Sequence, residues 1–296
     1  MKRFLPILLA ILLVFSGCSM QSDNKKDDGK LKITATIFPQ YDFLREITKG
    51  VEDVELSLLI PPGKEVHSFE TSLSDISAVS NSDLFVYTGS EDDSWVKDIP
   101  ENGNVRLALC EIITDYEDEH VWTSPKNAIK IVLKLCDTLC EIDKKNALAY
   151  TENTDFYIES LTSLDDNFED VILNGNTKTI VFAERFPFLN FAKDYDLNHY
   201  SAFEGCSTET EAGIKTINFL IEKVKEENIP AIFTIEFSDG TVAETISNET
   251  GAEILQFHSC HNVTEEEFEK GETYISLMQN NLKNLEIALD NQNTGA

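Results

Sequence analysis

The sequence predicts an α/β fold of two lobes, each a mostly parallel sheet flanked by helices, with one long rigid helix joining them. A chain of 296 residues is long enough for two separate cores. Short apolar strands alternate with helical segments in both halves, which is typical of parallel sheets covered by helices. Between the halves, residues 147–172 form a long polar segment without a strong helix breaker, which predicts the connecting helix.

The strands of the first half are indicated by short apolar or alternating runs bounded by turn residues. Between the first two of them, a segment of helical spacing places Phe43, Leu44 and Ile47 on one face. The predicted strands are residues 31–37, 54–60, 83–87 and 105–109 in the first half, and 179–183, 231–236 and 252–257 in the second.

The charge balance excludes one class of partner. The chain has 53 acidic residues against 24 Lys and Arg, for a formal net charge of −29. Phosphate binding needs clustered basic residues, so we expect no nucleic-acid partner. An acidic surface suits a protein that handles cations, but an ordinary solvated surface is the stronger interpretation, because acidic solvated faces are common.

The first residues have the pattern of an export signal. Lys2 and Arg3 precede an apolar run, residues 4–15, which is too short to span a membrane. Residues 16–18 (Ser-Gly-Cys) then resemble the bacterial lipoprotein signal, although Phe15 stands where an aliphatic residue is usual. We therefore expect a signal peptide at 1–17, lipid on Cys18, and a flexible polar tether over 18–30.

His67 and His120 are the candidate ligands of the first half. His67 follows the strand 54–60 and a Pro-Pro-Gly turn, so it is expected on a loop at a strand end, where open α/β sheets bind ligands. His120 follows a polar run and precedes Ser124 and Pro125, an N-cap and N1 pair that starts a helix. By itself, a His beside a Trp is as readily a packed residue as a ligand.

Two segments carry a family resemblance. GKEVHSFETSLSDISAVSNSDLFVYTGSEDDSW around His67 and EHVWTSPKNA around His120 resemble the first two ligand segments of the zinc- and manganese-binding receptors of ABC importers. The resemblance extends over about residues 31–290. It implies an N-terminal lobe at 31–145, a linker helix at 146–174 and a C-terminal lobe at 175–296.

The second half offers further candidates at its strand ends. Glu184 ends the strand 179–183, at the position of the family's third ligand, although the alignment there needs one extra residue and Arg185 is an alternative partner. His258 stands where these receptors usually have Asp as the fourth ligand. His261 and Cys260 are near enough in sequence to bind the same ion or support it. Glu236 ends another strand, where a structural carboxylate is the better interpretation.

The resemblance and the ligand types together predict a cation site made of His67, His120, Glu184 and His258. Three imidazoles and one carboxylate favour tetrahedral Zn²⁺ over Mn²⁺, which prefers more oxygen ligands. His199 lacks support from the family and is expected at the surface.

The cysteines leave alternatives open. Cys136 and Cys140 lie one helical turn apart and are expected to pack. Cys206 and Cys260 could form a disulfide in an exported protein, or Cys260 could bind metal. With Cys110, five cysteines follow Cys18, so at least one is free.

The leading hypothesis is an extracytoplasmic, lipid-anchored, monomeric receptor that captures Zn²⁺, or alternatively Mn²⁺, and passes it to an ABC permease in the membrane, without enzymatic activity. One alternative is a zinc hydrolase, but the chain has no HExxH and a closed four-ligand site would leave no open position. Another is a surface adhesin with a structural metal.

Overall fold

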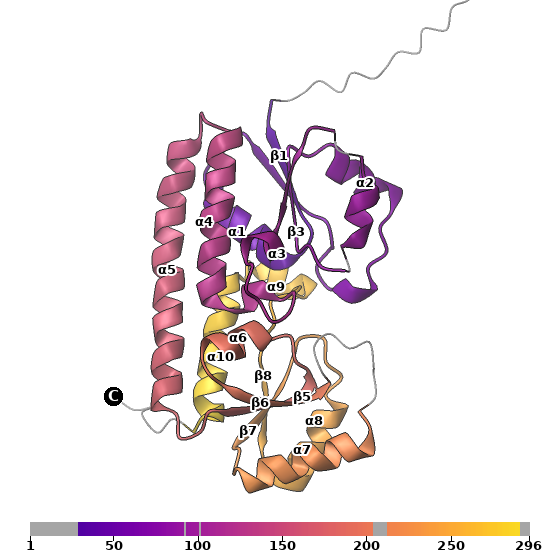
Figure 1. Cartoon of the computed structure of the whole chain (residues 1–296), viewed down its shortest axis with the longest axis vertical. Helices are drawn as coiled ribbons and strands as arrows, with labels where there is room; N and C mark the ends of the chain where they lie inside the picture. The colour runs from indigo at the N-terminus through magenta and orange to yellow at the C-terminus, as the bar shows by residue number, and fades with distance from the viewer. Residues whose placement is uncertain (1–28, 92, 101, 204–211, 291–296) are drawn as a thin grey trace, which may run out of the picture. The chain divides into compact units, whose positions relative to one another are not determined.

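Two four-stranded sheets organise the protein, and all strand pairs in both are parallel (Figure 1). The computed structural model describes residues 29–91, 93–100, 102–203 and 212–290. Cys18 and Cys206 therefore lie outside the described residues, with the signal peptide and most of the tether. The chain divides into residues 1–30 and residues 31–296, and both sheets belong to the second unit.

The first sheet has the strand order β2-β1-β3-β4. Its central strands are buried because helices cover both faces, as parallel sheets require. The residues between β2 and β3 include η1 and α2. The elements of this part are β1 (Leu31–Ala35), α1 (Phe38–Ile47), β2 (Val54–Leu58), η1 (Val66–Ser68), α2 (Leu73–Ser80), β3 (Leu84–Tyr87), η2 (Ser94–Asp98), β4 (Val105–Ala108) and α3 (Leu109–Ile112).

The second sheet repeats this strand order as β6-β5-β7-β8. The helices α6, α7 and α8 connect its successive strands, and such crossover connections allow the strands to run parallel. The elements are β5 (Thr179–Arg185), α6 (Leu189–Asp194), β6 (Asn198–Phe203), α7 (Ile214–Glu226), β7 (Ala231–Thr234), α8 (Thr241–Thr250) and β8 (Glu253–Gln256). The expected α/β fold of two parallel-sheet lobes is confirmed.

Long helices run beside both sheets (Figure 1). After η3 (Val121–Thr123), α4 (Pro125–Ile142) begins with Ser124 as N-cap and Pro125 at N1, as predicted. The connecting helix α5 (Ala147–Asn174) extends two residues beyond the polar segment 147–172 and ends at the residue that the resemblance implies for the linker helix. The last helices of the described residues are α9 (Glu265–Lys270) and α10 (Tyr274–Ala288), and α10 packs against α5.

One large core joins the parts. It contains Phe43 and Trp122 from the first half together with Phe182, Phe233 and Phe257 from the second. Hydrogen bonds add to this apolar contact: the Tyr274 hydroxyl donates to the Trp122 carbonyl at 2.8 Å. The two sheets are therefore held in one packed unit.

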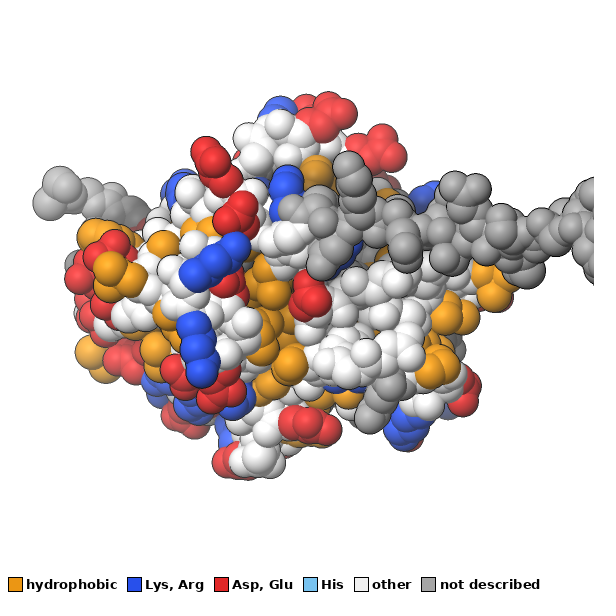
Figure 2. Space-filling view, turned by 90° about the horizontal axis from the view of Figure 1, so that it is seen from above, with side chains coloured by type: hydrophobic (Ala, Val, Ile, Leu, Met, Phe, Trp, Pro, Cys, Tyr) orange, Lys and Arg blue, Asp and Glu red, His pale blue; other side chains and the backbone are white. Residues whose placement is uncertain are grey.

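The described surface is mixed in charge. Figure 2 shows one face, on which acidic and basic side chains are interspersed around hydrophobic ones. Among the described residues, no helix combines the length and the apolarity that crossing a bilayer demands.

Candidate metal centre

His67 lies in η1, on the segment that leaves β2. The preceding turn is tied to the loop after β8: Gly63 N donates to the Val263 carbonyl at 2.7 Å, and Asn262 Nδ2 donates to the Pro61 and Lys64 carbonyls at 2.9 Å each. The positive φ of Gly63, 78°, is the conformation that glycine adopts without strain. These bonds fix His67 beside the second sheet's last loop.

His120 is the N-cap of η3 and is 1% exposed. Its backbone N donates to Asp118 Oδ1 at 3.0 Å, and its Nδ1 lies 3.5 Å from the same oxygen. Asp118 is in turn held by Asn190 Nδ2 of α6, at 2.8 Å. A carboxylate beside one ring nitrogen fixes the orientation of an imidazole and leaves the other nitrogen to face a cation.

His261 lies on the loop after β8. Cys260, just before it, has φ 60°, an uncommon left-handed conformation for a non-glycine residue. The Trp122 indole donates to the Ser259 carbonyl at 2.9 Å, which ties this loop to η3. Burial, followed by the charges of His120 and His67, lowers the pKa of His261 well below its usual value. The ring is therefore neutral at neutral pH, the state that binds metal.

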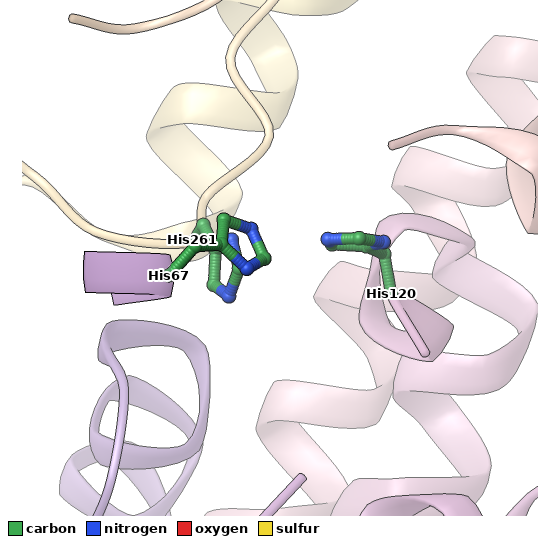
Figure 3. Close-up of side chains that lie close together, drawn as sticks. All are labelled: His67, His120 and His261. Atoms are coloured by element: carbon green, nitrogen blue, oxygen red, sulfur yellow. The ribbon is translucent and has the colours of Figure 1, made fainter. Parts of the chain in front are cut away.

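The three imidazoles converge from these three segments (Figure 3). One nitrogen from each of His67, His120 and His261 lies within 4.8 Å of the others. The ring centroids of His67 and His261 are 4.8 Å apart, and that of His120 is 5.1 Å from His261 and 6.0 Å from His67. Three nitrogen ligands with one open position form a recognised zinc arrangement.

The other predicted ligands lie outside this group. Glu184 accepts a hydrogen bond from the Ser238 hydroxyl, and burial raises its pKa. His258 is 2% exposed, and its Nδ1 accepts from Cys260 N at 2.9 Å. Since Nδ1 is an acceptor, the ring proton is on Nε2, which has no hydrogen-bond partner among the described residues.

Glu236 and Cys260 are also engaged elsewhere. Both carboxylate oxygens of Glu236 accept from Ser259, one from its N at 2.8 Å and one from its hydroxyl. Cys260 is a free and fully buried thiol, whose pKa is raised by burial. Within the described part of the chain, the structure thus brings together His67, His120 and His261, but not Glu184, His258, Glu236 or Cys260.

His199 is the remaining one of the chain's five histidines, and it is partly buried. It stacks on Phe186, with ring centroids 4.1 Å apart, and burial lowers its pKa. Cys136 and Cys140 lie with their sulfurs 4.0 Å apart on α4, and both are free, as is Cys110.

Two cavities adjoin the histidine cluster and share His67 and His261 as walls. The larger, of about 300 Å³, is lined on the first-sheet side by Glu91, Asp93 and Glu119 among others. The smaller, of about 30 Å³, has room for roughly one water and is lined by Lys64, Glu65, Arg185 and Glu236 among others. The cluster therefore adjoins an acidic chamber and a smaller cavity whose walls carry two cations and two carboxylates.

Residues 33–288 match the family model described as "ZnuA: Zinc-uptake complex component A periplasmic". The chain belongs to the ZnuA family. This confirms the resemblance carried by the His67 and His120 segments.

Two curated relatives illustrate the extent of the match. The zinc-binding lipoprotein AdcA of Streptococcus pneumoniae is 30% identical over 317 residues, covering 99% of this chain and 62% of AdcA. The high-affinity zinc uptake system protein ZnuA of Bacillus subtilis is 27% identical over 310 residues, covering 96% of each. The chain thus spans about 62% of the length of the AdcA relatives that it matches.

Solved ZnuA-like structures share the fold. The Zn(II)-bound ZnuA-like domain of S. pneumoniae AdcA has a TM-score of 0.76 and 29% identity, covering 88% of this chain and 100% of that domain. The metal-dependent lipoprotein YcdH of B. subtilis has a TM-score of 0.78 and 29% identity, covering 88% of this chain and 99% of its own.

Proposed function

We propose that this chain captures a zinc ion outside the cytoplasm and delivers it to the permease of an ABC importer. The cluster of three imidazoles carries the proposal, since nitrogen ligands suit Zn²⁺ better than Mn²⁺. Membership of the ZnuA family, whose description names a zinc-uptake complex, supports it, as does the Zn(II)-bound state of the AdcA domain. In this role the chain is a receptor and performs no chemistry on its cargo.

We propose His67, His120 and His261 as the protein ligands. Each must be neutral to bind, and Asp118 orients His120 so that one ring nitrogen faces the ion. This set differs from the one expected from sequence, in which Glu184 and His258 took part. With three protein ligands, a water molecule supplied from the adjoining chamber would complete the tetrahedron.

The location outside the cytoplasm is supported by the family's description as periplasmic and by the name lipoprotein of the pneumococcal relative. Acylation of Cys18 would hold the receptor, as a monomer, at the outer face of the cell membrane near its permease. Mass spectrometry of a membrane-extracted sample tests this: a diacylglyceryl adduct on Cys18 is expected, and a free, unprocessed N-terminus would contradict it.

Competitive metal loading tests the cargo. Purified metal-free protein is incubated with equal amounts of Zn²⁺ and Mn²⁺, desalted, and analysed for its metals. We expect about one zinc per chain and almost no manganese, because imidazole favours zinc. Retention of manganese in excess, or of neither metal, would overturn the proposal.

A zinc hydrolase is the second candidate, because three histidines with an open position also describe catalytic zinc sites. A receptor should show no metal-dependent turnover of ester and peptide substrates. Hydrolysis that depends on zinc and disappears in His261→Ala would favour the enzyme.

A further inference from the structure

The charges around the histidine cluster are unequal on its two sides. The large chamber has Glu91, Asp93 and Glu119 among its walls, and no Lys or Arg is among the described residues that line it. The small cavity on the other side is lined by Lys64 and Arg185, besides two carboxylates. A cation at the cluster is attracted by the acidic chamber, whereas in the small cavity two cations oppose that attraction and two carboxylates offset them.

Arg185 is fixed close to the cluster by its place in the fold. It is the last residue of β5, and it follows a register shift between Phe182 and Arg185 in the pairing of β5 with β6. Its side chain is 28% exposed and lines the same small cavity as His67 and His261. Its charge also contributes to lowering the pKa of His261, behind burial and the other two histidines.

The guanidinium forms an ion pair with another wall of the cavity. Arg185 Nη2 lies 3.6 Å from Glu65 Oε2, and Glu65 immediately precedes η1, the turn that contains His67. The pair therefore joins the end of β5 to the segment that presents a proposed ligand. Glu236, the other carboxylate of the cavity, has both oxygens hydrogen-bonded to Ser259.

We propose that Arg185 is a built-in counter-charge that weakens the hold of the histidine cluster on a divalent cation and speeds its release, and that Glu65 masks this charge by pairing with it. The proposal rests on the proposed function, since it presumes that His67, His120 and His261 bind the ion. It makes the Glu65–Arg185 pair a determinant of affinity.

The physical basis is the charge of the occupied site. Neutral imidazoles leave the full double charge of the cation, and in a partly buried site this charge is only partly screened from a nearby guanidinium. Pairing with Glu65 holds the guanidinium and cancels part of its field. Breaking the pair would expose the cation to the unmasked charge, as a receptor that must give up its cargo requires.

A double-mutant cycle tests the proposal. Zinc affinity is measured by competition with a chromophoric chelator, and the release rate by mixing the zinc-loaded protein with excess chelator, for wild type, Arg185→Gln, Glu65→Gln and the double variant. We expect Arg185→Gln to bind zinc about three- to tenfold more tightly and to release it more slowly. Glu65→Gln should bind more weakly, and its loss should be larger in the wild-type background than in the Arg185→Gln background, because only the former holds a charge to unmask.

Two further variants separate charge from structure. Arg185→Lys keeps the charge and should retain wild-type zinc affinity within about twofold. If the guanidinium of Arg185 instead had a structural role, Arg185→Lys and Arg185→Gln would both bind zinc more weakly. Lys178→Gln removes an equal charge from an exposed pair with Asp196 and should change nothing. The differences in zinc affinity between wild type and the Arg185 and Glu65 variants should shrink at high salt.

The outcomes are distinct. Unchanged or weakened zinc binding in Arg185→Gln, with wild type binding normally, overturns this proposal alone. Equal effects of Glu65→Gln in both backgrounds overturn the masking role of Glu65. A wild-type protein that binds no zinc removes the proposed function and this inference together.

Discussion

His258 and His261 share one loop but lie in different environments. His258 directly follows Phe257 and is locked by Cys260 N and, through its backbone, by Asn281. The left-handed turn at Cys260 then redirects the chain, so that His261 reaches His67 and His120. A difference of three positions along the loop thus places His261 in the cluster and leaves His258 outside it.

The first test at this scale compares His261→Ala with Glu184→Gln. The former removes a proposed ligand and should weaken zinc binding by roughly tenfold or more. The latter preserves shape and the contact with Ser238, and should change affinity by less than about twofold. Isothermal titration calorimetry measures both, and the reverse order would restore the set expected from sequence.

Asp118 offers a second test. Asp118→Asn replaces the carboxylate beside His120 Nδ1 by a neutral amide, so the ring loses its charged orienting partner. We expect zinc affinity to fall about tenfold, within the range known for such partners, while the melting temperature of the metal-free protein changes little. An unaltered affinity would mean that His120 is positioned by packing on Trp122 alone.

The depressed pKa of His261 predicts a pH dependence of folding. The unfolded chain takes up a proton near the ordinary value of 6.5, whereas the folded chain resists it, so stability falls as pH drops below about 6.5 towards the lowered folded pKa. Asp42 acts oppositely, because burial raises its pKa to about 6 and the folded state binds that proton first. Because these two groups affect stability in opposite directions, the contribution of His261 is measured by comparing wild type with a variant of His261.

In metal-free His261→Gln, the stability profile between pH 6.5 and 5 should lose part of its slope, by at most about 1.4 kcal/mol per pH unit. Urea unfolding at several pH values measures it. Parallel profiles for wild type and variant would show that His261 titrates alike in the folded and unfolded chains.

The sequence alone predicts two of the three histidines in the cluster. The segments of His67 and His120 are recognised because their turn, cap and aromatic neighbours lie in contiguous stretches. The choice between His258 and His261 could not be made from sequence, because it depends on one backbone conformation and on Asn281, twenty-three residues away. The hydrogen bond from Ser238 to Glu184 could not be predicted either, since its partners are 54 residues apart.

At the scale of elements, Gly89 allows the close approach between the chain after β3 and the end of β4. It follows β3 with φ 85°, and a Cβ there would lie 2.8 Å from the Ala108 Cβ. Gly103 has the same φ, but no described atom lies within 4 Å of a Cβ there. Comparing the same substitution at the two glycines therefore separates the cost of backbone strain from the cost of steric clash.

We expect Gly103→Ala to destabilise the protein by about 1 kcal/mol through its backbone conformation alone. Gly89→Ala should cost about 1–3 kcal/mol more, because the overpacked pair must move apart. Chemical denaturation of both variants gives the comparison. Equal losses would show that the end of β4 moves away from residue 89 at no cost.

Local patterns predict most of the elements here. Alternating or apolar runs mark β1, β2 and β3, and Ser124-Pro125 marks the start of α4. The return of α10 to pack on α5 could not be anticipated, because the pairing of two amphipathic helices more than a hundred residues apart leaves no local signal.

For the whole molecule, the shared core predicts cooperative unfolding. Aromatic residues of both sheets belong to one cluster, and Trp122 and Tyr274 bond across it. We expect a single calorimetric transition whose van't Hoff and calorimetric enthalpies agree, and which zinc shifts upward as a ligand of the folded state. Two resolved transitions would show that the lobes unfold independently.

The contact of Trp122 with both His120 and His261 has a consequence for spectroscopy. Its indole centroid lies 5.3 Å and 5.0 Å from these two rings, and the chain has one other tryptophan, Trp95, which lines the chamber. Arrival of a doubly charged ion beside this indole changes the electric field on its excited state. We therefore expect the ultraviolet emission of the protein's own tryptophans to report occupancy of the proposed site, without any label.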